Sequence, residues 1–130
     1  MTTGLSAAMA NAALNALCRN VAWSQPVAFY VKLHTADPGA AGATAAAANT
    51  TRTQATFSAA SAGSLTTSGD CAWTNVPNAE TYSHVSFWDA STAGTFLGSD
   101  DLATPRTVAV GDNFTIKAGS LTLALTPVAA

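Results

Sequence analysis

Residues 27–34 have the sequence VAFYVKLH, and this stretch decides the fold. Alternation of apolar residues along it is typical of a β-strand with one buried face, formed here by Val27, Phe29, Val31 and Leu33. Aromatic and β-branched residues also favour strands. The turn sequence Asp37-Pro38-Gly39 follows, in which proline presets its backbone angle and glycine accepts a positive φ. We therefore predict a core strand over residues 27–34.

Short segments of the same character follow along the chain. We expect further strands at 52–57, 71–76, 81–89, 95–102, 106–110, 114–116 and 121–125. Segment 81–89 carries aromatic side chains on both faces, which is typical of a central strand. The close spacing of strands and turns favours a sandwich or jelly roll. The sequence therefore predicts an all-β, jelly-roll-like β-sandwich of about seven or eight strands over residues 27–126.

An alanine-rich segment precedes the sandwich and has the period of a helix over residues 3–20. Its apolar residues recur at steps of three to four and form one stripe: Leu5, Met9, Ala12, Ala13, Leu17 and Val21. Thr2 or Thr3 is expected to cap the start, and Asn20 to end the helix in the left-handed conformation. The opposite face carries almost no charge. Two arrangements stay open: a helix packed only on its own domain, and a helix packed between the sheet and a partner.

The composition fits a single domain spanning residues 1–130. The chain has 130 residues, of which 48% are hydrophobic and 9% charged, and 30 of them are alanine, so few large side chains are left for a core. The net charge is -2 and the five basic residues are scattered, which argues against binding to nucleic acid or to a membrane surface. No apolar run reaches the ~18 residues of a membrane span. Segment 5–17 has no preceding basic residue, so we expect no signal peptide and synthesis in the cytoplasm.

The side chains that could support catalysis or hold a metal are few. His34 with Asp37, and His84 with Asp89, would form a metal site only if their strands were neighbours, and alternation places His84 and Asp89 on opposite faces. A catalytic triad would need Ser83 or Ser86, as well as a strained turn that the sequence lacks. We predict no catalytic residues, no metal and no cofactor.

Aromatic and cysteine residues leave two further alternatives open. A sugar-binding platform would be built from Tyr30, Trp73, Tyr82 and Trp88, although their positions within strands favour the core. Cys18 and Cys71 are too few for a disulfide framework and lack the spacing of a zinc site. Two reduced, partly buried thiols are the expected state, with a disulfide between them as the alternative.

A surface poor in charge and rich in Thr, Ser and Ala loses little hydration when it packs against protein, which suits repeated assembly. Segment 39–51 has the sequence GAAGATAAAANTT and almost nothing to bury, so we expect a surface loop there. We name as candidate interface residues three from the apolar stripe and four from the loop and its end: Leu5, Met9, Leu17, Ala40, Thr44, Asn49 and Arg52.

Three segments of the chain resemble small virion proteins of tailed bacteriophages. They are YVKLHTADPG at 30–39, ETYSHVSFWDASTAGTFLG at 80–98, and VAVGDNFTIKAGSLTLAL at 108–125, so the resemblance spans nearly the whole chain. Members of that family are often labelled tail fibre or minor tail protein, and similar β-sandwiches decorate capsids. The resemblance implies a structural virion component and brings no catalytic residues with it.

These observations lead to one main hypothesis and two alternatives. The main hypothesis is a capsid decoration protein on the outer surface of the virion, assembled in the host cytoplasm as a homo-oligomer, expected to be a trimer, that binds the major capsid protein. The first alternative is a tail-associated structural protein of the same fold. The second is a carbohydrate-binding module for host attachment.

Overall fold

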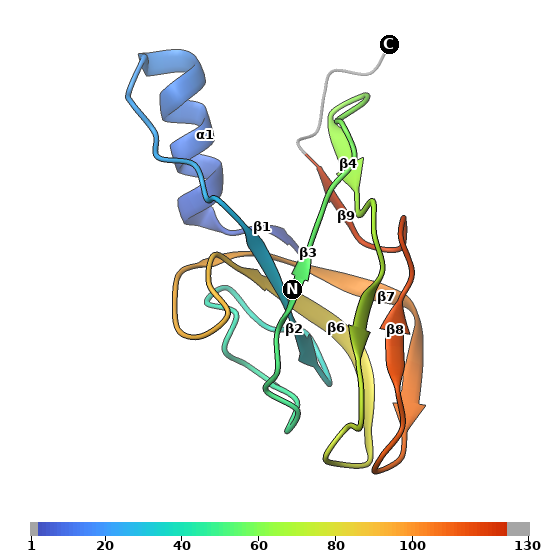
Figure 1. Ribbon diagram of the computed structural model, residues 1–130. Coiled ribbons are helices and arrows are strands. Elements are labelled where there is room, and N and C mark those ends of the chain that lie inside the picture. Colours follow the sequence, from blue (N-terminus) through green and yellow to red (C-terminus); the bar gives the residue numbers. More distant parts are fainter. Residues whose placement is uncertain (1–2, 125–130) are drawn as a thin grey trace.

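The computed structural model describes residues 3–124 and shows antiparallel strands with one helix standing beside them (Figure 1). The elements are β1 (Gly4–Leu5), α1 (Ala7–Arg19), β2 (Phe29–His34), β3 (Thr53–Ala55), β4 (Ser64–Thr66), β5 (Cys71–Trp73), β6 (Glu80–Trp88), β7 (Phe96–Val108), β8 (Phe114–Ile116) and β9 (Thr122–Ala124). The predicted all-β class with one N-terminal helix is confirmed.

One five-stranded sheet, in the order β1-β7-β6-β2-β3, forms the larger layer. β6 pairs with β2 on one side and with β7 on the other, so the prediction of a central strand at 81–89 is confirmed. Among residues 3–124 the opposing layer consists of two separate ribbons, β4 with β9 and β5 with β8, instead of a second continuous sheet (Figure 1).

The core lies between these layers and contains several aromatic rings. Phe87 of β6 is fully buried, and its ring centroid lies 6.2 Å from those of Phe29 and Phe57. On the ribbon side, the ring of Phe114 lies 5.1 Å from Tyr82 and 5.8 Å from Trp73. These rings fill space that the alanines leave empty, because aromatic side chains bury the largest apolar area per residue.

Several strand boundaries differ from those expected. β2 begins at Phe29, and the side chain of Val27 is 99% exposed outside the sheet. β4 lies between the expected strands at 52–57 and 71–76, where we expected no strand. β7 runs through Pro105 as one strand, where two strands were expected. The register with β6 jumps from Arg106 to Asp101, so the proline falls within an irregular stretch of the ladder that does not need its missing N–H.

The same irregularity changes which side chains of β6 face the core. Strict alternation places Tyr82 on the face opposite Val85 and Phe87, but the register shift between Tyr82 and His84 turns all three inward. Each of the three is fully buried. A bulge thus interrupts the alternation, so that side chains before and after it can point to a different face of the sheet than their spacing predicts.

The helix begins four residues later than expected. Residues Gly4–Leu5 pair with β7 as strand β1, and the cap is Ser6, whose Oγ accepts a hydrogen bond from the backbone N–H of Met9 at 3.2 Å. A Cβ on Gly98 would lie 2.7 Å from the carbonyl oxygen of Gly4, so glycine at 98 permits this close pairing. Asn20 ends the helix with φ of 54°, as predicted.

Segment 39–51 is a loop, as expected, because no helix or strand falls within it and most of its residues are exposed, but it lies against the sheet. The predicted turn is present, since Asp37 Oδ1 accepts from the N–H of Gly39 at 2.8 Å. The chain then folds back along β2, where the N–H of Ala47 donates to the carbonyl of Leu33 at 3.1 Å. Ala47 is 2% exposed. Small side chains let this segment approach closely and satisfy backbone groups at the sheet edge.

Thr2, Leu125 and the predicted end of the sandwich at residue 126 lie outside the described residues.

Candidate functional site

The structure places the seven predicted interface residues in different surroundings. Leu5 and Met9 are half-buried and line the same hollow. Leu17 is 76% exposed near the far end of α1. Ala40 and Thr44 are exposed on the folded-back segment.

Asn49 and Arg52 are engaged within the chain itself. Asn49 is buried, and its Oδ1 accepts from the N–H of Thr51 at 3.3 Å. The Arg52 guanidinium lies 4.5 Å from the ring centroid of Trp88 and donates to the carbonyls of Ala90 and Ala93 at 2.8 and 2.7 Å. Arg52 therefore closes the 89–95 connection, and neither side chain is free for a partner in this arrangement.

The helix and the segment that follows it expose an unusual amount of apolar surface. No residue of α1 is buried, and the helix projects away from the sheets (Figure 1). Within residues 3–124, every exposed large hydrophobic side chain except Val110 lies in this part of the chain; they are Leu14, Leu17, Val21 and Val27. We call residues 14–27 the apolar arm. Exposed apolar patches of this kind mark interaction sites.

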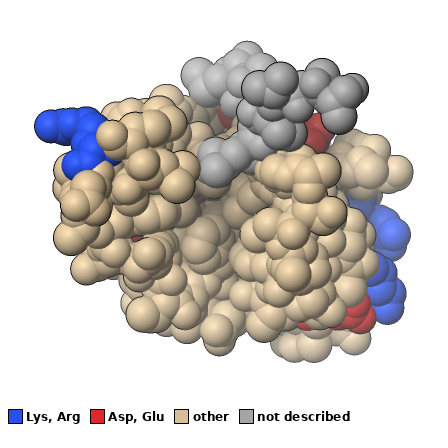
Figure 2. Space-filling model, turned by 90° about the horizontal axis from the view of Figure 1, so that it is seen from above, with Lys and Arg blue, Asp and Glu red and all other residues tan. Residues whose placement is uncertain are grey.

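Charge is almost absent around the arm. Arg19 is the only charged residue of α1, and it donates to the Asn15 side chain at 3.4 Å. Seen from above, the face that carries the helix is covered almost entirely by uncharged side chains (Figure 2). Such a surface can be covered by protein without burying unpaired charge.

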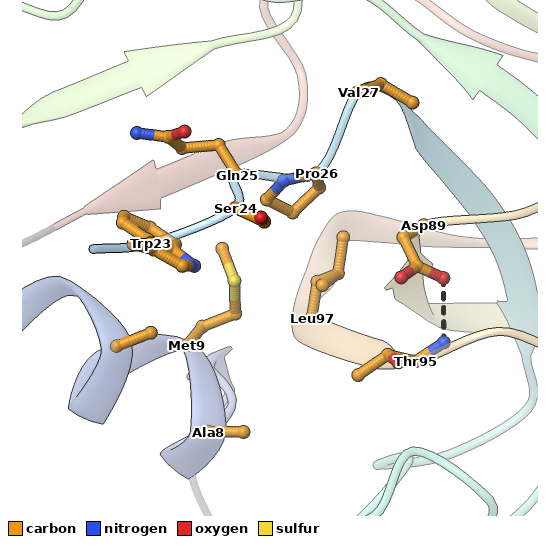
Figure 3. A pocket seen from close by; sticks show the side chains of 11 residues that line it. Ala8, Met9, Trp23, Ser24, Gln25, Pro26, Val27, Asp89, Thr95 and Leu97 are labelled. Carbon is orange, nitrogen blue, oxygen red and sulfur yellow. Dashed lines mark hydrogen bonds between the residues drawn. The ribbon is translucent and has the colours of Figure 1, made fainter. Parts of the chain in front are cut away.

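A first hollow of about 400 Å³ lies beside the base of α1 (Figure 3). Met9, Trp23 and Leu97 give it apolar walls, and Asp89 lies across from Trp23 in Figure 3. Asp89 Oδ1 accepts from the N–H of Thr95 at 2.7 Å, which fixes the carboxylate at the edge of the hollow. Trp23 was not among our candidate residues because it lies outside every expected strand. The feature of the sequence that could have identified Trp23 was its position just after the end of the helix.

A second hollow, which we call the apolar groove, is also lined by Met9 and has a volume of about 330 Å³. It lies between the base of α1 and the β4–β9 ribbon, and none of the residues within 3–124 that line it is charged. Its larger lining residues are apolar: Leu5, Met9, Phe29, Phe57, Leu65 and Leu123. The groove is assembled from four separate stretches of the sequence, at 5–9, 29, 57–65 and 123–124, so sequence periodicity revealed only Leu5 and Met9.

Of the two serines considered in the sequence, Ser83 contacts His84, with its Oγ 2.8 Å from Nδ1, whereas Ser86 contacts His34. His34 Nε2 lies 2.7 Å from Ser86 Oγ, and His34 Nδ1 lies 2.8 Å from the carbonyl oxygen of Thr44. Because a carbonyl only accepts, Nδ1 carries the proton and Nε2 accepts from Ser86. Trp88 Nε1 donates to the same Ser86 oxygen at 2.7 Å.

This hydrogen-bond network is enclosed. His34 and Ser86 both have 0% exposure, so no substrate reaches the Ser86 oxygen in this arrangement. Burial lowers the pKa of His34 below its usual range, and its bond to Thr44 opposes that shift only in part. The network resembles a buried structural cluster more closely than a nucleophile with its base.

The structure also bears on the sugar-binding platform, the cysteine pair and the metal site that the sequence left as alternatives. Trp73 and Tyr82 are buried and Trp88 is covered by Arg52, so these rings do not form an exposed sugar platform. Cys18 is exposed, Cys71 is buried, and both thiols are free. Residues 3–124 contain no group of three or more His, Cys, Asp or Glu side chains placed to hold a metal. In the same range, none of the helical structure is long and apolar enough to span a bilayer.

Comparison with known proteins gives one informative match. The curated proteins contain no match to this sequence. Among protein families, residues 4–124 match the family described as Podophage GP4 fiber I protein gp80. The match covers nearly all of the chain, including α1, the apolar groove and every strand. The chain therefore belongs to the Podophage GP4 fiber I protein gp80 family and is a structural protein of a tailed bacteriophage.

Proposed function

We propose that this protein is a tail-associated, non-enzymatic fibre component that assembles with further copies of itself through the apolar arm and the base of α1. The single observation that carries the proposal is a helix with no buried residue in a chain of a fibre family. An isolated helix of 13 residues is marginally stable in water, so contact with a neighbouring subunit would stabilise it.

Burial of the arm would supply useful binding energy. Covering an exposed Leu or Val side chain contributes about 1.5–3 kcal/mol, and the arm has four such side chains. A specific interface needs roughly 800 Å² from each partner, which a helix and the surface at its base can provide together. In a symmetric assembly the same contact is repeated, so several contacts of modest affinity together hold the subunits firmly.

The enclosed Ser86–His34 pair supports a structural role. Ser86 accepts one hydrogen bond and donates another, and it is out of reach of solvent. The family match favours the tail over the outer capsid surface as the location.

The number of copies per virion tests this location. We expect purified virions to contain a small number of copies relative to the major capsid protein, consistent with a few fibres on one tail, as measured by quantitative mass spectrometry. Antibody labelling should mark the tail end of the particle. Hundreds of copies spread over the head would instead establish capsid decoration, and absence from the virion would overturn both locations.

The first hollow favours saccharide binding as a second candidate function. It combines the aromatic ring of Trp23 with the carboxylate of Asp89 and the hydroxyl of Ser24. Aromatic faces pack against sugar C–H groups, while a carboxylate accepts from sugar hydroxyls. Its volume of about 400 Å³ is within the usual range for small-molecule sites.

Saccharide binding would change the fluorescence of Trp23. We expect a saturable change when a panel of hexoses and N-acetylhexosamines is titrated, and we expect Trp23→Ala to abolish it, because Trp73 is buried and Trp88 is covered. Val110→Ala, on the exposed turn after β7, is the matched control and should keep the response. Failure of the whole panel, or a response that survives Trp23→Ala, removes this candidate.

A further inference from the structure

We propose that Leu14 and Leu17 from the apolar arm of one copy insert into the apolar groove of the next copy. This contact specifies how copies of the chain would associate, and it rests on the self-assembly proposed above. The two exposed leucines act as the inserted side chains, and the groove beside Met9 receives them.

The groove has the chemistry of a site for aliphatic side chains. Phe29 and Phe57 form one wall, with ring centroids 5.3 Å apart and an interplanar angle of 82°, which is a favourable edge-to-face contact. Leu65 and Leu123 are contributed by the β4–β9 ribbon. The described residues that line the groove include no charged side chain, so a charged ligand would lose its hydration without gaining an ion-pair partner among them.

The leucines of the arm are too far along the helix to fill the groove of their own chain. Met9 lines the groove, whereas Leu17 lies eight residues further along, which corresponds to about 12 Å of helix rise. The helix axis also points away from the sheets (Figure 1). Leu14 and Leu17 are 58% and 76% exposed, so most of each side chain is left uncovered by residues 3–124.

A second copy is the occupant that these observations favour. The chain carries both an exposed pair of leucines and an apolar groove, and one repeated contact between copies would cover both. The described lining of the groove carries no charge, and the arm carries one charged side chain, Arg19, which donates to Asn15 of the same helix. An unrelated protein would have to cover two separate apolar surfaces to achieve the same burial.

The proposed contact differs from helix–helix self-association. Insertion of the arm into a groove joins different surfaces, and it gives a ring, an open filament or a reciprocal twofold pair. Pairing of α1 with α1 would join identical surfaces and leave the groove uncovered. Substitutions in the groove therefore distinguish the two arrangements.

Single substitutions provide the first test, read out by sedimentation equilibrium of the full chain. We expect Leu17→Glu on the arm and Ala60→Glu in the groove each to weaken self-association about 100-fold, because each buries an unpaired charge at the contact. Ala60 is exposed, so its replacement leaves the core intact. Val110→Glu is the control: Val110 is 68% exposed and lies outside both surfaces, so this variant should assemble normally.

Mixing the two weakened variants provides the second test. Leu17→Glu keeps an intact groove and Ala60→Glu keeps an intact arm, so we expect the mixture to form a discrete heterodimer. If Ala60→Glu assembles like the unsubstituted chain, or if the mixture stays monomeric, the proposed contact is wrong while self-assembly can still hold. An unsubstituted chain that stays monomeric would overturn self-assembly itself and this contact with it.

Discussion

Replacing Phe87 by alanine is expected to lower the free energy of unfolding by about 3–5 kcal/mol. Phe87 has 0% exposure and packs against Phe29 and Phe57, with ring centroids 6.2 Å away in both cases. Its removal loses apolar burial and leaves a cavity that two stacked layers cannot easily close. The loss is a large part of the total stability of a typical domain, which is about 5–15 kcal/mol.

Urea denaturation followed by circular dichroism measures this change. Phe87→Leu is the matched control, because it keeps most of the volume and should cost clearly less. The alanine variant should also lose the apolar groove, since Phe29 and Phe57 form its wall. A decrease below about 1 kcal/mol for Phe87→Ala would mean that this ring cluster is not the centre of the core.

Replacing Ser86 by alanine is expected to lower the free energy of unfolding by about 1–3 kcal/mol. Ser86 Oγ is the partner of His34 Nε2 and of Trp88 Nε1, and the substitution leaves both without that hydrogen bond. His34 has 0% exposure, so water cannot easily replace the lost partner. Ser83→Ala is the matched control: Ser83 also bonds a histidine, His84, but both residues are only half-buried. Equal losses from the two variants would contradict the importance of the enclosed network.

The same network makes stability depend on pH. Burial lowers the pKa of His34 in the folded protein below its unfolded value of about 6.5, so the folded state binds this proton less readily. The stabilising contribution is therefore present above about pH 6.5 and is lost as the pH falls through the folded pKa. His34→Gln keeps a donor and an acceptor but does not titrate, so the acid-dependent loss between about pH 7.5 and pH 5.5 should be smaller in that variant. An identical loss in both proteins would rule out His34 as its source.

Local sequence patterns were sufficient for several elements. Alternation from Phe29 to Leu33 predicted a core strand, and aromatic residues on both sides of 81–89 predicted its central place. Asn20 and the Asp37–Gly39 turn were predicted from backbone preferences of single residues. These features depend on neighbours within a few positions, so they can be recognised without the rest of the chain.

Elements that depend on distant partners could not be recognised in this way. β1 pairs with Gly98 and Ser99, more than ninety residues away, and this pairing moved the helix start to Ser6. Segment 39–51 is a loop, as its few large side chains predicted, but the sequence did not show that it folds back along β2 and buries Ala47. Its order comes from backbone hydrogen bonds at the sheet edge, which composition does not reveal.

The candidate site also combines features that depend on neighbouring residues with features that depend on distant ones. The sequence by itself determined the fold class, the uncharged apolar stripe with Met9 and Leu17, and the shortage of catalytic groups. Only the tertiary structure decided that Ser86 meets His34 instead of His84, and that Phe57 and Leu123 join Met9 in one groove. Periodicity is a property of consecutive residues, whereas a groove or a buried network depends on the register between strands that are far apart in the chain.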